Sequence, residues 1–375
     1  MLEWQHTPNT CTKQKRAIMN AYHSALCDRA IELVISAAQR GWSPKDLLHV
    51  LGNYCYPIIY RAAGRIPAHI TSTVLRKEWL TLEPPTSMAM STQEVETLVE
   101  EVTRLPWLRD VDVLAEKTNS SPLRNRKEEK IRTKIINLLK KAESTPYEEE
   151  ASALIAKAQS LQQQHRLDGL CSDSPLKFVS KRIHISAPYI NHQSTLLSAI
   201  ADRNGCSALQ LHPKGIITIF GAEDDLDHVI DLFTSLQRQC DWHMRHGEHA
   251  EIAQQLGNLA SYRRSFILSY ASRIGELLDE ANKSFTPQDA DDTDSGPSAQ
   301  QDAQNALAQS RRALHALDQR RLDAEAIRDR YFPRARTISL AMGSHAGVSA
   351  GASAAEKSHL SGDSAGVKGR RQLTR

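Results

Sequence analysis

The densest group of side chains that could bind a metal ion lies in the stretch WHMRHGEHAE. It contains His243, His246 and His249. Histidines three residues apart can share one face of a helix and supply two ligands to a zinc ion. The third histidine turns further around the helix, and neither HExxH nor HxxEH is present. The pattern favours a solvated helix end, and the three histidines are retained as the candidates for a metal site.

A second group of titratable residues contains the candidates for catalysis, Glu143, His165 and Asp168. His165 could act as an acid or a base if the carboxylate of Glu143 or Asp168 reached it. Alternatively, His165 caps the C-terminal end of a helix, where a cation is favourable. The sequence leaves both roles open.

Basic residues gather in two places that could contact phosphates. Arg124 to Lys141 holds eight Lys and Arg against two glutamates, and the segment from Arg334 holds seven. A basic helix and a basic tail predict a salt-sensitive, sequence-independent interaction with nucleic acid. The alternative is a solvated helix face and a solubilising tail. The residues expected to bind nucleic acid are Lys127, Lys130, Lys134, Lys141, Lys368, Arg370 and Arg371.

Two further features of these basic segments bear on their partners. Neither contains an aromatic residue, which argues against the binding of single strands by base stacking. In the tail, Gly343, Gly347 and Gly351 recur every four residues and would align along one helix face, permitting close approach of a partner. The Gly and Ser content of the tail favours disorder in the free protein instead.

An αα-hairpin is the element expected to position the first basic segment. One apolar stripe runs from Ile131 to Ala142, and a second runs from Ala151 to Leu161. Between them, Thr145 is an expected N-cap and Pro146 an expected first helical residue. Lysines at the C-terminal end of the first helix and glutamates at the N-terminal end of the second both interact favourably with the helix dipoles. The charge asymmetry of this stretch therefore has a structural explanation.

The hairpin sequence LLKKAESTPYEEEASALIAKAQSLQQQHRLD resembles the family called domain of unknown function 2786, which occurs in bacterial and phage proteins. The run Lys141 to Thr145, the run Lys157 to Gln159, and His165 and Asp168 fit its pattern. Gln162 stands where a methionine is usual. The resemblance implies a helical hairpin; it brings no established activity, and the cofactor stays unknown.

The whole chain is expected to be a mainly helical α+β protein. The αα-hairpin is followed by a small β-α-β-β-α unit and a long helix, with a disordered linker and tail. At 375 residues the chain exceeds one typical core, so several parts are expected. The expected parts are an N-terminal helical region (1–82), a linker with one helix (83–123), the αα-hairpin (124–170), a small α+β domain (171–285), an acidic linker (286–300), a helix (301–332) and a basic flexible tail (333–375).

Composition restricts the compartment and the function classes. The six cysteines form no CxxC pair, and no run of 18 apolar residues is present. The first twenty residues have no apolar segment typical of a signal peptide. We therefore expect a cytoplasmic location without a membrane partner. The leading hypothesis is a non-enzymatic, nucleic-acid-associated or regulatory protein; the alternatives are a metal-dependent hydrolase or nuclease that uses His and Glu, and an adaptor that binds a protein partner.

Overall fold

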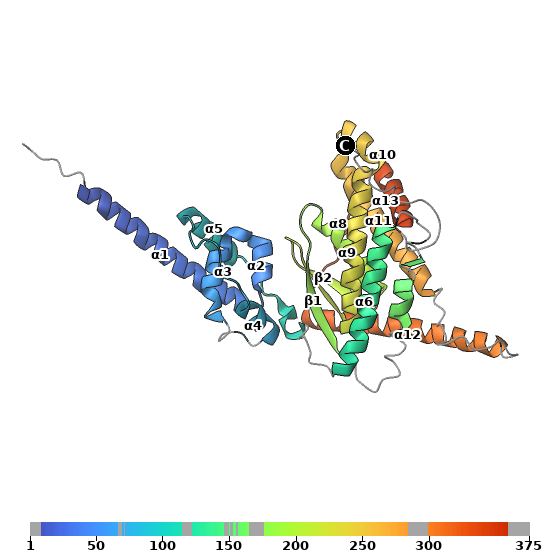
Figure 1. Cartoon of the computed structure of the whole chain (residues 1–375). Helices are drawn as coiled ribbons and strands as arrows, with labels where there is room; N and C mark the ends of the chain where they lie inside the picture. Colours follow the sequence, from blue (N-terminus) through green and yellow to red (C-terminus); the bar gives the residue numbers. More distant parts are fainter. Residues whose placement is uncertain are drawn as a thin grey trace, which may run out of the picture. The chain divides into compact units, whose positions relative to one another are not determined.

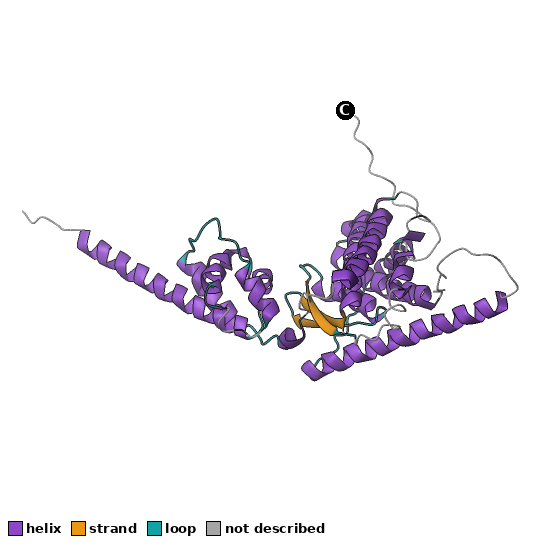
Figure 2. Cartoon of the chain, turned by 60° about the horizontal axis from the view of Figure 1, so that its bottom comes forward, coloured by secondary structure: helices purple, strands orange, loops and turns teal. Residues whose placement is uncertain are grey.

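The computed structural model describes residues 9–66, 70, 72–114, 122–145, 150, 153–154, 157–164, 176–283 and 299–358. The chain divides into two compact units, Met1–Lys117 and Thr118–Arg375. Helices predominate, and one small antiparallel sheet lies in the second unit (Figure 2). This confirms the predicted α+β, mainly helical class. Within the described ranges, no helix is long and apolar enough to cross a bilayer.

The first unit is built from helices around a core that contains Trp42 and Trp79. The indole Nε1 of Trp79 donates to the carbonyl of Trp42 at 3.3 Å. The helix α5, expected in the linker 83–123, packs on α1 and so belongs to this unit (Figure 1). Its elements are α1 (Asn9–Gln39), α2 (Pro44–Leu51), α3 (Tyr56–Ala63), α4 (Thr73–Leu80) and α5 (Thr92–Thr103), with short 3-10 turns at Asn53–Cys55 and Arg109–Val113.

Two helix starts in this unit follow directly from local sequence. Ser43 and Asp46 form a reciprocal capping box at α2. The amide of Ser43 donates to Oδ2 of Asp46 at 2.9 Å, and the amide of Asp46 donates to Oγ of Ser43 at 3.1 Å. Ser91 and Glu94 do the same at α5. Each pair satisfies amide groups that have no partner inside the helix.

The second unit contains the predicted β-α-β-β-α succession. The strands β1 (Phe178–His184), β2 (Ser207–His212) and β3 (Ile216–Ala222) pair in the order β1-β3-β2, all antiparallel. The helix α8 (Ile190–Asp202) connects β1 to β2, and α9 (Glu223–His246) follows β3. β3 is buried along its whole length because α9 and α12 (Ala299–Tyr331) both pack against it.

The long helix expected after the β-α-β-β-α unit is interrupted. Gly257, with φ +70°, separates α10 (Glu248–Gln255) from α11 (Leu259–Lys283). A positive φ suits glycine and ends a helix, which the apolar periodicity of the region does not reveal.

The segment 333–375, expected to be a flexible tail, differs from that expectation over α13 (His345–Lys357), which packs along α11 (Figure 1). Gly347 and Gly351 permit the close approach: a Cβ at Gly347 would lie 2.5 Å from the carbonyl oxygen of Tyr262. The glycine repeat therefore docks a helix inside this unit. Residues 359–375 and the linker residues 284–298 lie outside the described residues.

Candidate nucleic-acid interface

The helix α6 (Pro122–Ser144) turns one face inward and the other outward. On the inward face Ile135, Leu139 and Ala142 are buried, each about 3% exposed. They belong to the apolar stripe that the sequence predicts. The helix lies beside α9 (Figure 1). Arg132 anchors it there: Nη1 lies 3.2 Å from Asp227, and Nε lies 3.5 Å from Asp231.

The second part of the hairpin, residues 157–164, is helical and contributes amide side chains to the core. Ala158 is buried, and so are Gln159, Gln162 and Gln163. These glutamines recur at helical spacing, on a face where apolar residues are the rule. Lys157 points to solvent. This part of the hairpin therefore packs inward through polar side chains.

The buried glutamines join a network of polar side chains from the turn after α8 and from α9, α11 and α12. Gln159 Nε2 donates to Oδ1 of Asn204 at 3.2 Å and to Oδ1 of Asn282 at 3.1 Å. Gln163 Nε2 donates to Asn282 at 2.5 Å. Asn282 in turn donates to the carbonyl of Arg203 at 2.9 Å. The buried polar network consists of Gln159, Gln162, Gln163, Asn204, Asp225, His228, Asn282 and Arg320.

An ion pair lies at the centre of this network. Arg320 Nη1 lies 2.7 Å from Oδ2 of Asp225, and the two side chains are 6% and 0% exposed. Gln162 donates to the other oxygen of Asp225 at 3.2 Å. His228 Nε2 contacts Oε1 of Gln159 at 2.9 Å. Because buried polar groups must be hydrogen-bonded, this arrangement fixes how the hairpin docks on the sheet-bearing unit.

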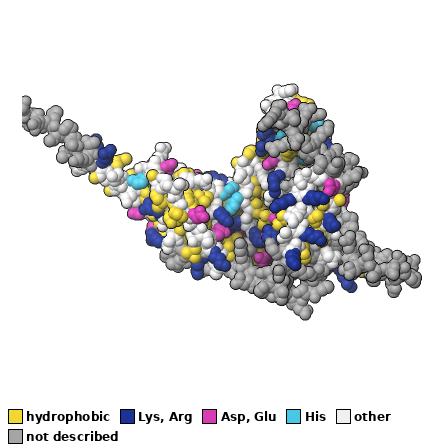
Figure 3. Space-filling model, viewed as in Figure 1, with side chains coloured by type: hydrophobic (Ala, Val, Ile, Leu, Met, Phe, Trp, Pro, Cys, Tyr) yellow, Lys and Arg dark blue, Asp and Glu magenta, His cyan; other side chains and the backbone are white. Residues whose placement is uncertain are grey.

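The outward face of α6 is basic. Lys130, Lys134 and Lys140 are exposed, and none of them has an ion-pair partner among the described carboxylates. Figure 3 shows Lys and Arg side chains gathered over the face of the second unit that carries α6. Lys141 is exposed but paired, since its Nζ lies 2.7 Å from a carboxylate oxygen of Glu150. This contact lowers the pKa of the Glu150 carboxyl.

Beneath this face, Asp227 and Asp231 are acidic groups in contact with Arg132 of α6. Burial raises the pKa of Asp231, and the neighbouring Arg132 offsets part of that rise. The charge of Arg132 is shared between two carboxylates, so it contributes less to an external field than the three exposed lysines. The row Lys130, Lys134 and Lys140 is therefore the part of α6 best placed to attract an anion.

The other residues predicted to bind nucleic acid lie where their side chains are not described. The backbone of Lys127 lies within α6. Lys368, Arg370 and Arg371 lie outside the described residues. The same holds for the catalytic candidates His165 and Asp168, while Glu143 lies in the last turn of α6. A catalytic group formed by these residues stays a prediction.

The three histidines named as candidates for a metal site lie at the end of α9 and in α10. The ring of His246 stacks on Trp242, with centroids 4.9 Å apart and planes 18° apart, and its Nδ1 lies 2.8 Å from the carbonyl of Trp242. His243 meets the same indole edge-on at 5.0 Å. Across the described ranges, no three His, Cys, Asp or Glu side chains converge on a point where they could hold a metal ion.

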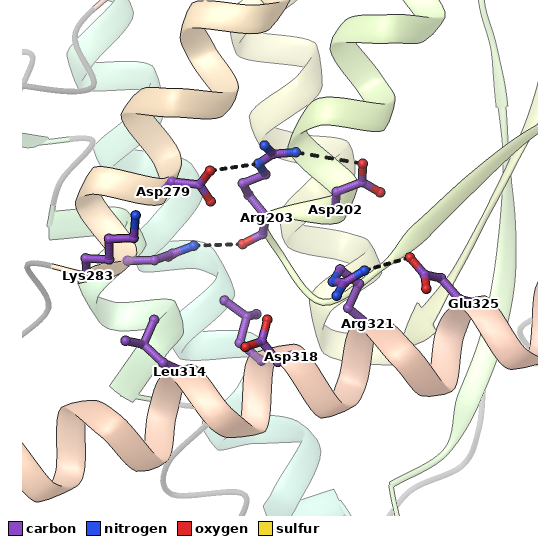
Figure 4. A pocket seen from close by; sticks show the side chains of 10 residues that line it. Asp202, Arg203, Asp279, Lys283, Leu314, Asp318, Arg321 and Glu325 are labelled. Atoms are coloured by element: carbon purple, nitrogen blue, oxygen red, sulfur yellow. Dashed lines mark hydrogen bonds and ion pairs between the residues drawn. The ribbon is translucent and has the colours of Figure 1, made fainter. Parts of the chain in front are cut away.

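A pocket of about 440 Å³ opens between the ends of α8 and α11 and the middle of α12 (Figure 4). Two ion pairs lie in its lining: Arg203 Nε lies 3.3 Å from Asp279, and Arg321 lies 2.8 Å from Glu325. Burial raises the pKa of Asp202 despite the adjacent Arg203. Asn282 links the pocket to the buried polar network. The pocket is polar and can accommodate a small hydrophilic molecule.

Sequence reasoning missed the buried polar network. The only signal was the run Gln159 to Gln163, where glutamines occupy positions that the hairpin pattern assigns to its inner face. Their partners Asn204 and Asn282 lie 45 and 123 residues away from Gln159. No local pattern connects such distant residues.

Comparison with known proteins bears on the same hairpin. Neither the curated proteins nor the solved structures contain a match to this chain. The family model described as Protein of unknown function (DUF2786) matches residues 130–168, which include the basic row of α6 and the glutamines of the network. Residues 130–168 are therefore similar to the DUF2786 family, in agreement with the resemblance seen in the sequence.

Proposed function

We propose that this protein binds nucleic acid through the phosphate backbone, using the outward face of α6. The observation that carries the proposal is the division of the hairpin into two faces. Its inward face is occupied by the apolar stripe and the buried polar network, while Lys130, Lys134 and Lys140 remain exposed without described carboxylate partners. Solvated lysines in a row can neutralise phosphates at little structural cost.

The spacing of this row fits an extended polyanion. With a rise of about 1.5 Å per residue, Lys130 and Lys140 stand roughly 15 Å apart along α6. Duplex DNA presents one negative charge per about 1.7 Å of its axis, so several phosphates lie within reach of the row. Such contacts fix position and carry no sequence information. We therefore propose sequence-independent binding without a chemical step.

The test is the salt dependence of binding to random duplex DNA. We expect the triple variant Lys130→Gln, Lys134→Gln and Lys140→Gln to make the negative slope of log K against log salt shallower by about 2.7, since each phosphate contact contributes about −0.9. Lys45→Gln, an exposed lysine on α2, is the matched control and should leave the slope unchanged. Absence of binding at about 50 mM salt, or an unchanged slope in the triple variant, would remove the proposal.

We place this activity in the cytoplasm. Support comes from the cysteines: Cys27, Cys55, Cys206 and Cys240 are free thiols, and all four are buried. Buried, unpaired cysteines are typical of proteins kept in a reducing compartment. Finding the protein in an extracellular or periplasmic fraction of its host would contradict this part of the proposal.

A further inference from the structure

We propose that Trp242 and His246 form a stacking platform for an unpaired base of a nucleic acid strand. This inference deepens the proposed function and rests on it, because it adds a base contact to a phosphate-binding surface. Trp242 is 41% exposed although it is the largest kind of apolar side chain. Its ring already stacks on His246, which is itself exposed. Bases of any kind offer a flat face to such a surface.

The platform is held in a fixed orientation. The Nδ1–H of His246 donates to the carbonyl of Trp242 at 2.8 Å, which sets the tilt of the imidazole one turn further along α9. His243 supports the indole from its edge at 5.0 Å. On the opposite side of the helix, Cys240 and Met244 are buried and anchor this end of α9 in the core. A rigid aromatic surface loses little conformational entropy when a base stacks on it.

Two arginines flank the platform on the same helix face. Arg238 and Arg245 are exposed, and they lie four residues before and three residues after Trp242. The acidic group among them is Asp241, whose carboxylate interacts with Arg245. Guanidinium groups beside an aromatic ring match a strand in which each base is followed by a phosphate. This pairing of charge and ring is the reason for choosing a nucleic acid strand as the ligand.

The same face of α9 leads to the basic row of α6. Helical spacing places Asp231, Arg238, Trp242 and Arg245 on one side of α9, at intervals of seven, four and three residues. Arg132 of α6 contacts Asp231, so α6 borders this side of α9. A strand bound along α6 can therefore reach the platform. Stacked bases inside a duplex do not present their faces, which makes an unpaired segment the preferred ligand.

The experiment compares the full chain's binding of a fluorescent oligothymidylate with its binding of an abasic strand of equal length and charge. We expect the thymidylate to bind about tenfold more tightly at one fixed salt concentration. Trp242→Ala should lower the ratio of the two affinities to about one without changing the slope of log K against log salt. Trp242→Phe should restore part of the preference for thymidylate. Trp107→Ala removes a 62% exposed tryptophan of the first unit and should keep the full ratio.

The outcomes separate this inference from the proposed function. Equal binding of both strands by the wild-type chain, or an unchanged ratio in Trp242→Ala, overturns the stacking platform while phosphate binding stands. Failure of both strands to bind at low salt overturns the proposed function itself, and the platform with it. His246→Ala is a second variant that removes the supporting ring, and a full ratio in that variant would also contradict the platform.

Discussion

Replacing Gly351 by alanine tests the packing of α13 on α11. A Cβ at position 351 would clash with the carbonyl oxygen of Phe266, and it would lie 3.0 Å from the carbonyl carbon and 3.1 Å from the Cα of the same residue. These atoms belong to the backbone of a buried helix and cannot rotate away, unlike the end of a flexible side chain. The two helices must separate to admit the methyl group.

The expected loss of stability follows from three contributions. Overpacking of a tight contact costs about 1–3 kcal/mol. Separation also weakens two hydrogen bonds, from Ser269 Oγ to the carbonyl of Val348 at 2.7 Å and from the amide of Ser344 to Ser265 Oγ at 3.0 Å, worth about 1 kcal/mol each. Alanine offsets about 1 kcal/mol because its helix propensity exceeds that of glycine. We expect a net loss of about 2–4 kcal/mol in the free energy of unfolding of this unit.

Urea unfolding followed by hydrogen exchange at the amides of α13 measures this loss. Ser349→Ala is the matched control, because Ser349 is exposed on the same helix and its replacement should change stability by at most about 0.5 kcal/mol. If only helix propensity mattered, Gly351→Ala would stabilise the protein, because alanine favours the helix more than glycine does. A gain of about 1 kcal/mol would therefore refute the close approach of the two helices.

Three further predictions concern side chains of the second unit. Arg320→Met leaves Asp225 buried without its ion-pair partner and should lower the free energy of unfolding by about 3–5 kcal/mol, with partial recovery in the double variant Arg320→Met, Asp225→Leu; a urea double-mutant cycle measures the coupling. Burial raises the pKa of Asp202, so its ionisation destabilises the fold as pH rises above about 3.9, the pKa of an unfolded aspartate. Asp202→Asn should therefore raise the melting temperature at pH 7 and change it little at pH 3, and equal shifts at both values would contradict this. Burial also raises the pKa of Cys240 well above its ordinary value, so a thiol reagent should label Cys240 only after unfolding, as peptide mapping would show.

The parts of this fold that sequence predicts are those set by neighbouring residues. Ser91 and Glu94 form their capping box within four residues, and the apolar stripe of α6 follows from its spacing alone. Alternation predicts the strands, and the glycine at 215, with φ +92°, suits the tight turn between β2 and β3. Local chemistry therefore determines the order of elements in the sheet-bearing unit.

The parts that sequence does not predict depend on distant partners. The glycine repeat of α13 permits either a free tail or a docked helix, and the decision depends on the carbonyls of Tyr262 and Phe266 on α11. The histidines of WHMRHGEHAE carry the spacing of metal ligands, yet the structure stacks His246 on Trp242. In both cases the residue types are visible in sequence, while their partners are supplied by tertiary packing.

Because α9 is one continuous helix, a tilt at its first turn displaces its last turn. Its first turns hold Asp225 and His228 in the polar network, and its last turns hold Trp242. A straight rod of 24 residues measures about 36 Å, so a tilt of roughly 5° at its base displaces the tip by about 3 Å. A change in the seating of the hairpin is thereby amplified at the far end, as by a lever arm.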